Sequence, residues 1–459
     1  MVSRRGRAGF RRYDPRRERD PAPPGIDRFM NACIWYISKY AALPSRGIAG
    51  TRAFMLLREF VRSGHKSLMI TSDSNHLTQV PDLDRPSMHM TVEGVDVCWV
   101  RTMKFKGAKS LGRILSWLDF EWRLWRLDTT QFPRPDAVIV SSLSLLTIFN
   151  GLRLRRRYGC RLIFEVRDIW PLSIVEEGGF SRYNPFVIML GLIERLAYRR
   201  ADAIVGTMPN LKQHVQEEVA RHAPVHCIPF GVDPDMIENV TPAPPEWIEA
   251  HVPEGKFVVC HCGTIGITNA LDTLLECARD MRDQAEIHFL LVGDGDLRAQ
   301  YQARCADLSN VTFTGRVQKE MVQSVIARCD LLYFSAHPSK VWDYGMSLNK
   351  IIDYMLSAKP ILGSYSGFRT MIEEAGSGSV VPAGDVASLK AELLRYFAMS
   401  TAEREVMGAR GREWLLRNRS YRRLAEEYLR IALPDRAAAE HRSNESPLDH
   451  PVQATFVRS

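Results

Sequence analysis

The stretch FVVCHCGTIGITNALDTLLECARDM, residues 257–281, decides the fold. Its apolar start, Phe257–His261, predicts a buried strand, and the two glycines of Cys262–Gly266 predict a tight loop. The periodic apolar residues of Ala270–Met281 then predict a helix. A strand, a glycine loop and a helix in this order are typical of a parallel sheet. The helix start lies at the carboxyl edge of such a sheet, where ligands bind.

The same pattern occurs in the first half of the chain. Cys33–Ile37 is a predicted strand, Pro44–Gly50 a loop with glycines, and Thr51–Ser63 a helix. Each unit alone is a weak signal, because glycines serve the turns of many strand–helix loops. Their recurrence predicts an α/β protein of two Rossmann-like domains that face each other across a cleft, with a ligand in the cleft.

Length and charge set the expected organisation. The 459 residues exceed one typical core, and a Pro-rich stretch near Val240–Gly255 marks the domain boundary. Residues 1–28 carry nine Arg and four acidic residues, so this tail supplies most of the net charge of +8 and nucleic acid is not an expected partner. The expected units are a disordered basic tail (1–30), two Rossmann-like domains (31–240 and 241–433) and a disordered tail (434–459).

Cysteine and apolar content indicate the compartment. The nine Cys are dispersed without a C-x-x-C pair, and the twelve His show no ligand spacing. We therefore expect a reducing compartment and no metal site. No secretory signal opens the chain and no apolar run is long enough to span a bilayer, so a cytoplasmic protein is expected.

The segment GMSLNKIIDYMLSAKPIL, Gly345–Leu362, adds chemistry to this frame. Ser347 is a candidate helix cap, and Asn349 and Lys350 fall in the first helical turn. Asp353 lies one turn further on. A helix start with a cation suits a phosphate, and a carboxylate suits neighbouring sugar hydroxyls. These residues together can grip a nucleotide; the alternative is a capped helix with a solvated lysine.

Further segments follow in order along the chain: FEVRDIWPLSIVEEGGF, IPFGVD, HCGTIG, LLVGDGDL and NVTFTGRV. With them the chain resembles, over residues 33–432, the retaining nucleotide-sugar glycosyltransferases of family 4, which have the two-domain GT-B fold. More narrowly, it is similar to the branch that builds bacterial surface polysaccharides such as O-antigen and capsule. That branch often uses UDP-linked aminosugars.

The resemblance implies transfer of a sugar from a UDP-linked donor to a glycan or polyprenyl-diphosphate-linked acceptor. The first domain then binds the acceptor and the second the donor. Asp353 would bind the ribose hydroxyls, while Arg316 and Val317 frame the base. A plain turn is the alternative for Gly293 and Asp294. The implied donor-binding residues are Gly47, Gly50, Gly263, Thr264, Gly266, Gly293, Asp294, Arg316, Val317, Ser347, Asn349 and Asp353.

Two positions depart from the family's pattern. The first acid of its E-x7-E motif falls on Gly345, and its basic pair falls on the uncharged Thr264 and Asn269. A leaving diphosphate needs its charge balanced, so Lys350 is the expected catalytic cation and Arg167 the second.

The expected mechanism is a front-side attack in which the leaving phosphate takes the acceptor's proton. Double displacement would need a carboxylate, and Asp168 is the candidate. The alternative for Arg167 and Asp168 is an ion pair that braces the Trp170-Pro171 turn. No cofactor and no metal are expected, because Asp294-Gly295-Asp296 lies in a predicted turn.

A lipid-linked acceptor would require a surface that contacts the inner face of the plasma membrane. Gly112–Leu127, with three Trp among arginines, and the cluster Arg153–Arg157 are candidates. For both, the alternative is a helix that packs within the domain. Two other functions stay open: an inactive transferase-like binding or regulatory protein, and a UDP-sugar 2-epimerase.

Overall fold

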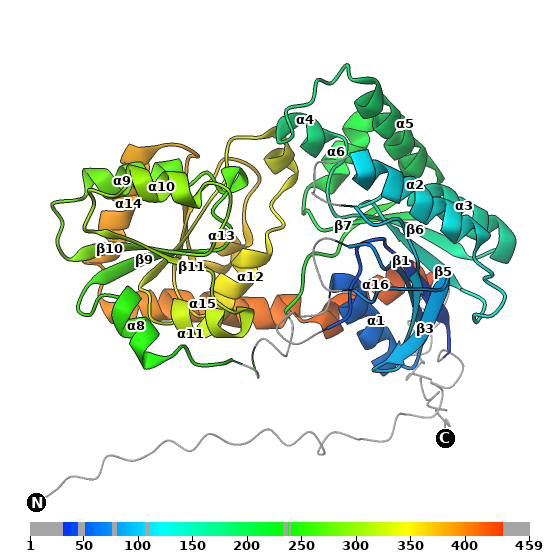
Figure 1. The fold of residues 1–459 in the computed structure, drawn as a ribbon, viewed down its shortest axis with the longest axis horizontal. Helices are drawn as coiled ribbons and strands as arrows, with labels where there is room; N and C mark the ends of the chain where they lie inside the picture. Colours follow the sequence, from blue (N-terminus) through cyan, green and yellow to red (C-terminus); the bar gives the residue numbers. More distant parts are fainter. Residues whose placement is uncertain are drawn as a thin grey trace, which may run out of the picture.

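The computed structural model describes residues 31–44, 51–75, 80–105, 111–232, 237 and 240–434. The predicted N-terminal tail and the chain beyond Pro434 lie outside these residues, as does the loop 45–50 with Gly47 and Gly50. Two α/β lobes lie side by side in Figure 1, each around a mainly parallel sheet. The predicted fold class is therefore confirmed.

The N-terminal lobe contains an eight-stranded sheet of order β3-β4-β2-β1-β5-β6-β7-β8. β3 pairs antiparallel with β4, and the other neighbours pair in parallel. The strands are β1 (Cys33–Ile37), β2 (Lys66–Ser72), β3 (Ser87–Val92), β4 (Val95–Val100), β5 (Ala137–Ser141), β6 (Arg161–Val166), β7 (Ala203–Gly206) and β8 (Val225–Cys227).

Helices cover both faces of this sheet, because its central strands are apolar on both sides. α1 (Arg52–Arg62) packs on one face. The short α4 (Leu172–Glu176) follows β6 at the carboxyl edge of the sheet. The other face carries α2 (Leu111–Arg126), α3 (Thr147–Tyr158), α5 (Pro185–Arg200) and α6 (Leu211–Glu218).

The C-terminal lobe contains a six-stranded, all-parallel sheet of order β11-β10-β9-β12-β13-β14. The strands are β9 (Phe257–Cys262), β10 (Ile287–Val292), β11 (Val311–Gly315), β12 (Leu331–Ser335), β13 (Ile361–Ser364) and β14 (Gly378–Val381). The helices are α8 (Pro245–His251), α9 (Asp272–Asp280), α10 (Arg298–Arg304), α11 (Val322–Ile326), α12 (Asn349–Leu356), α13 (Met371–Ala375), α14 (Val386–Ala398) and α15 (Thr401–Arg419).

In each sheet the strand order reverses beside the first strand of the lobe. The reversal lies between β1 and β5 in one sheet and between β9 and β12 in the other. Ligands bind at such switch points in open α/β sheets, because the neighbouring loops diverge and leave a crevice. The glycine loop that opens the second domain therefore stands at the position where a ligand is expected.

The last helix of the described residues, α16 (Tyr421–Ala432), leaves the C-terminal lobe and packs on α1 of the N-terminal lobe (Figure 1). The Tyr428 ring lies 6.0 Å from the Phe60 ring. The predicted second domain, 241–433, therefore includes a helix that belongs to the first core. Where the chain crosses, Val232 N donates to Arg419 O at 2.7 Å, so the two crossing segments lie side by side.

A second contact between the lobes comes from the short 3₁₀ helix η4 (Lys340–Tyr344). Tyr344 is 1% exposed and packs into the core of the N-terminal lobe. Its hydroxyl donates to Glu217 Oε2 at 2.5 Å, and its carbonyl accepts from Asn210 N at 2.9 Å. Its ring lies 4.9 Å from the His214 ring. The C-terminal lobe thus docks one aromatic side chain into its neighbour.

Candidate active site

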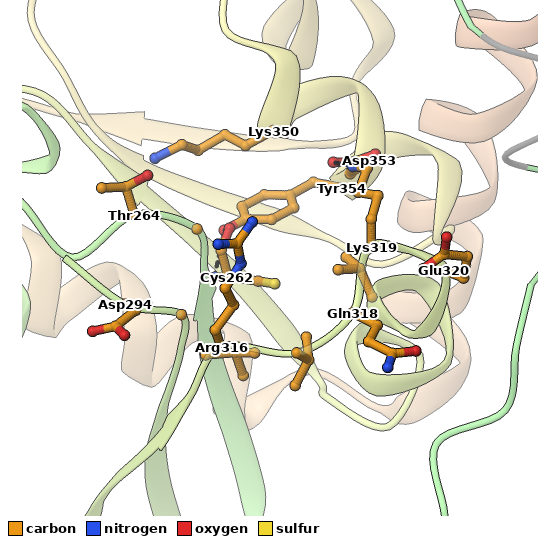
Figure 2. Close-up of a pocket in the computed structure, with 15 residues that line it drawn as sticks. Cys262, Thr264, Asp294, Arg316, Gln318, Lys319, Glu320, Lys350, Asp353 and Tyr354 are labelled. Carbon is orange, nitrogen blue, oxygen red and sulfur yellow. Dashed lines mark hydrogen bonds and ion pairs between the residues drawn. The ribbon is translucent and has the colours of Figure 1, made fainter. Parts of the chain in front are cut away.

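A cavity of about 1010 Å³ lies at the carboxyl ends of β9, β10 and β11 (Figure 2). One wall is α12, and another is the 3₁₀ helix η3 (Lys319–Met321). A nucleotide sugar fits a cavity of this size. The lining residues are Cys262, Gly263, Thr264, Val292, Gly293, Asp294, Arg316, Val317, Gln318, Lys319, Glu320, Val322, Lys350, Asp353 and Tyr354.

Lys350 brings a positive charge to the loop that follows β9. Its ammonium donates to Asn269 Oδ1, and it lies 3.6 Å from the place that a Cβ on Gly263 would occupy. Burial lowers the pKa of Lys350 to about 8. Burial and the nearby Lys350 lower the pKa of His261 to about 3, so this imidazole is neutral. The family's pattern has a basic residue at the position of Asn269. Here Asn269 instead binds the cation that α12 supplies.

Gly263 and Gly293 lie where the loops after β9 and β10 touch. Gly293 has a φ of +141°, and a Cβ there would fall 1.8 Å from the carbonyl oxygen of Gly263. The loops are linked by Gly263 N donating to Val292 O at 2.9 Å. Because Gly293 has no room for a side chain, bare backbone forms this wall of the cavity. Packing explains why position 293 is a glycine, and both Gly293 and Asp294 line the cavity.

Asp353 lies one helical turn beyond Lys350 and is 9% exposed. Its Oδ2 accepts from Lys319 Nζ at 2.5 Å. Burial raises the pKa of Asp353, and the positive charge of Lys319 acts against that rise. Lys319 is absent from the residues that the sequence nominated. The sequence feature that could have identified Lys319 is its position, as a basic residue just after Arg316 and Val317, which both line the cavity.

Two nominated residues of the α12 segment lie elsewhere. The prediction that Ser347 caps the helix is wrong: Leu348 precedes α12 without a side-chain cap. Ser347 Oγ is buried without a hydrogen-bond partner, and the residue lines a small cavity between the lobes. Asn349 is exposed and does not line the large cavity. Apolar contacts of Leu348 and Ile351 with the C-terminal core position the helix start instead.

Other nominated residues are also outside the cavity lining. Gly266 precedes the short 3₁₀ helix η2 (Ile267–Asn269) and does not line the cavity. Gly47 and Gly50 fall outside the described residues. Thr264 lines the cavity beside Gly263.

Arg167 and Asp168 follow β6 in the N-terminal lobe and do not line the large cavity. The Asp168 carboxylate accepts from Trp170 Nε1 at 2.8 Å and from the Ser173 hydroxyl. The Arg167 guanidinium lies over the Phe230 ring, 5.3 Å from its centre. Asp168 thus braces the turn at Trp170 through hydrogen bonds to Trp170 and Ser173, rather than through the Arg167 ion pair considered above.

Gly345 occupies the position of the missing acid, and its surroundings explain the substitution. It has a φ of +106° and a ψ of 165°, a conformation that is essentially restricted to glycine. A Cβ there would fall 2.4 Å from Cδ of Pro209 in the N-terminal lobe. The contact between the lobes therefore excludes any side chain at this position.

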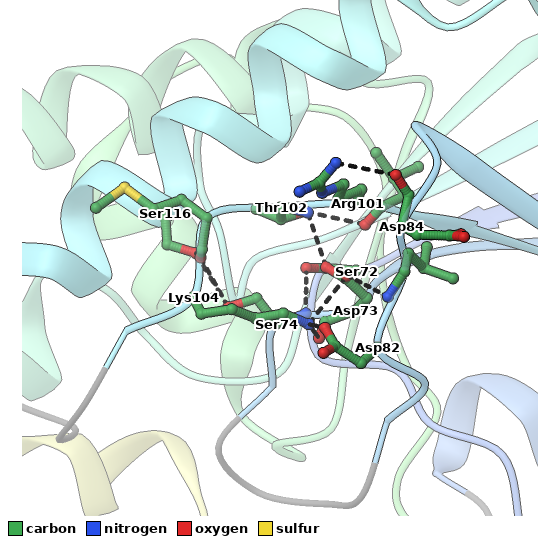
Figure 3. A network of polar contacts seen from close by, with 12 residues as sticks. Ser72, Asp73, Ser74, Asp82, Asp84, Arg101, Thr102, Lys104 and Ser116 are labelled. Carbon is green, nitrogen blue, oxygen red and sulfur yellow. Dashed lines mark hydrogen bonds and ion pairs between the residues drawn. The ribbon is translucent and has the colours of Figure 1, made fainter.

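A second cleft, of about 450 Å³, lies in the N-terminal lobe beside β4. Figure 3 shows the polar network around it. Lys104 Nζ pairs with Asp73 at 2.9 Å and with Asp82 at 3.3 Å. Ser116 Oγ of α2 donates to Met103 O at 2.7 Å. These bonds balance the Lys104 charge internally and fasten α2 to the carboxyl edge of the sheet.

Comparison with known families matches one description to each lobe. Residues 49–231 match "Glycosyl transferase 4-like domain", and residues 256–398 match "Glycosyl transferases group 1". The two lobes and the cavity at the second switch point define a glycosyltransferase with the GT-B fold. The two family models cover one lobe each, and both describe glycosyltransferases.

Solved structures share this fold at low sequence identity. Sucrose-phosphate synthase from Thermosynechococcus elongatus is 15% identical, with a TM-score of 0.63 over 89% of this chain and 100% of that chain. The E. coli trehalose-6-phosphate protein bound with UDP-2-fluoro glucose is 12% identical, with a TM-score of 0.68 over 88% and 99%. Anabaena HepE in complex with UDP and glucose is 13% identical, with a TM-score of 0.56 over 89% and 99%. A comparison with proteins of curated function gives no significant match.

Proposed function

We propose that the protein is a retaining glycosyltransferase that takes a sugar from a UDP-linked donor. The observation that carries this proposal is the single cavity wall on which α12 presents both Lys350 and Asp353. An ammonium suits a diphosphate, and a carboxylate suits the ribose hydroxyls. The E. coli and Anabaena structures, which hold UDP-2-fluoro glucose and UDP with glucose, support UDP as the nucleotide.

In the proposed reaction, the residues of this chain position the donor and balance charge. The acceptor oxygen forms a bond to the anomeric carbon as the bond to the diphosphate oxygen breaks. The leaving phosphate takes the acceptor's proton. Lys350 stabilises the charge that develops on the diphosphate, aided by the N-terminal end of α12. Asp168 is bonded to Trp170 and Ser173, which favours this front-side path over a double displacement through Asp168.

The acceptor that we propose is a glycan carried on a polyprenyl diphosphate, as in the assembly of a bacterial surface polysaccharide. Within the described residues, no helix combines the length and apolar character needed to span a bilayer. Contact with the inner face of the plasma membrane would then be peripheral. The surface that supports it is the outer side of α2, with the exposed Leu115, Leu118, Trp122 and Trp125.

Arginines surround these exposed tryptophans. Arg126 lies over Trp122 at 4.9 Å, and Arg153 of α3 lies over Trp125 at 4.8 Å. Trp117, by contrast, is 6% exposed and donates to Tyr40 within the lobe. One tryptophan of α2 thus packs in the core, while two stand outside beside cations, an arrangement that suits an anionic lipid interface.

We expect Arg126→Glu to weaken binding to phosphatidylglycerol vesicles about thirtyfold, because each charge near the surface contributes about 1 kcal/mol and the reversal changes the charge by two. Arg412→Glu makes the same charge change on the exposed side of α15 and serves as the control. Vesicle sedimentation measures both. Equal weakening by the two variants, or no binding by the unaltered protein, would reject α2 as the membrane surface.

A panel of UDP-, GDP- and ADP-sugars, with release of the free nucleotide diphosphate as the readout, tests the proposed function. Release from UDP-sugars in the presence of a lipid-diphosphate acceptor is the expected result. Binding of UDP without turnover would favour the inactive binding or regulatory protein. Conversion of a UDP-sugar into its 2-epimer without nucleotide release would favour the epimerase.

Asp353→Ala is expected to lower kcat/KM for the donor about a hundredfold, because charge-assisted hydrogen bonds to ribose are worth about 1.5–3 kcal/mol each. Asp283→Ala removes an exposed carboxylate of the same lobe and serves as the control. Steady-state kinetics with a UDP-sugar measure the change. Unaltered kinetics in Asp353→Ala would remove the ribose role.

A further inference from the structure

Lys319 and Asp353 form an ion pair at one end of the cavity. The Lys319 Nζ lies 2.5 Å from Asp353 Oδ2, and both residues line the cavity. Figure 2 shows this pair at the end away from the Lys350 ammonium, which points toward Thr264. Lys319 begins η3, directly after the segment Arg316–Gln318 on the cavity wall. The pair thus belongs to the end of the cavity where Asp353 would hold ribose.

Lys319 is the positive charge that opposes protonation of this carboxylate. Burial raises the pKa of Asp353, and Lys319 opposes the rise. Cys262 and Tyr354 beside it are neutral: burial raises the pKa of Cys262 to about 12 and holds the pKa of Tyr354 well above its usual range. The half-exposed Glu320 also lines this end, and its negative charge cannot take the place of Lys319.

The ion pair occupies only one of the two carboxylate oxygens of Asp353. Oδ2 is bonded to Lys319, and Gln323 Nε2 donates to the main-chain oxygen of Asp353 at 2.9 Å rather than to its carboxylate. Within the described residues, no hydrogen bond to Oδ1 occurs. Oδ1 therefore stays available to a hydroxyl of a ligand in the cavity.

We propose that Lys319 is a positioning residue for the nucleotide: it holds Oδ2 of an ionised Asp353, so that Oδ1 accepts a hydrogen bond from ribose. The proposal rests on the proposed function, since it deepens the role given there to Asp353. Lys319 acts through Asp353 and needs no contact with the nucleotide. Its removal should therefore change how donor affinity depends on pH rather than shift affinity equally at every pH.

The direction of that change follows from the charges. A carboxylate oxygen accepts a hydrogen bond from a hydroxyl better than a protonated carboxyl group does, so UDP affinity falls as Asp353 takes up a proton. Without Lys319, the pKa of Asp353 rises further, because the adjacent opposite charge that stabilises the carboxylate is lost. The acid-side loss of UDP affinity then begins at a higher pH.

The experiment measures UDP affinity by titration calorimetry across pH, for Lys319→Met, Lys319→Arg and Lys390→Met. In Lys319→Met we expect affinity near that of the unaltered protein at alkaline pH and a loss of about tenfold or more as the pH is lowered and Asp353 takes up a proton. Lys319→Arg keeps the charge and should restore the original profile. Lys390→Met removes a lysine that bonds the Asp280 carbonyl, far from the cavity, and should change nothing.

The outcomes separate the possible failures. A loss of affinity in Lys319→Met by the same factor at every pH would show that Lys319 contacts the nucleotide directly and would overturn the positioning role. An unchanged profile would overturn it as well. Failure of the unaltered protein to bind any nucleoside diphosphate would instead reject the proposed function. A retained unfolding transition in Lys319→Met verifies that the variant is folded.

Discussion

Lys350→Met is expected to lower kcat by about a hundredfold to a thousandfold, the cost of removing one preorganised group that stabilises developing negative charge. Burial lowers the pKa of Lys350 to about 8, because keeping the ammonium charged in this site costs free energy of desolvation. Removing that charge should leave the melting temperature nearly unchanged, although Asn269 loses its donor. Steady-state turnover of a UDP-sugar measures the loss of kcat, and thermal unfolding measures the melting temperature.

The same residue is expected to set an alkaline limit to activity. The proposed mechanism needs the protonated form of Lys350, so kcat/KM should fall as pH rises through about 8. A bound diphosphate stabilises the ammonium form of Lys350. The alkaline fall of kcat should therefore occur at higher pH than the alkaline fall of kcat/KM. Lys359→Met, which removes a half-buried lysine just after α12, serves as the control. A normal rate in Lys350→Met would exclude Lys350 as the charge-balancing group.

Gly345→Ala is expected to lower the melting temperature by about 5 °C or more and to reduce kcat/KM about tenfold. The φ of +106° makes a side chain unfavourable by about 1–3 kcal/mol. The Cβ would also fall 2.4 Å from Pro209 Cδ, so the contact between the lobes has to open. Gly345→Glu, which restores the acid expected from the family, should be at least as damaging.

A matched glycine isolates the contact with Pro209. Gly384 has a φ of +81° and nothing within 4 Å of an added Cβ, so Gly384→Ala carries backbone strain without a clash. The excess loss of stability and activity in Gly345→Ala over Gly384→Ala measures the docking of the lobes at Tyr344. If the two variants lose stability and activity equally, the contact with Pro209 contributes to neither.

The sequence predicted the central strands because burial on both faces leaves long apolar runs. β1 has the bounds of the predicted strand Cys33–Ile37, and β9 extends the predicted strand Phe257–His261 by one residue. β3 was missed: it is an edge strand, and Ser87–Val92 alternates without a fully buried face. The short strands β8, β13 and β14 were missed as well, since three or four residues carry too little pattern to stand out.

At the site, the sequence indicated Lys350 and Asp353 because both fall on one predicted helix, whose periodicity orders its side chains. Lys319 comes from another part of the chain, and only the folded sheet brings it to Asp353. The predicted Ser347 cap failed because apolar packing of Leu348 sets the start of α12. The role of Gly345 depends on Pro209, a neighbour from the other lobe that no local pattern reveals.

The crossing of α16 has a consequence for synthesis on the ribosome. The surface of α1 that receives Tyr421, Leu424 and Tyr428 is made early, but these partners emerge only after the strands of the second lobe. Until then, the nascent first lobe exposes apolar side chains such as Phe60 to solvent and chaperones. Loss of α16 by premature termination would leave the second lobe intact and the first one prone to aggregation.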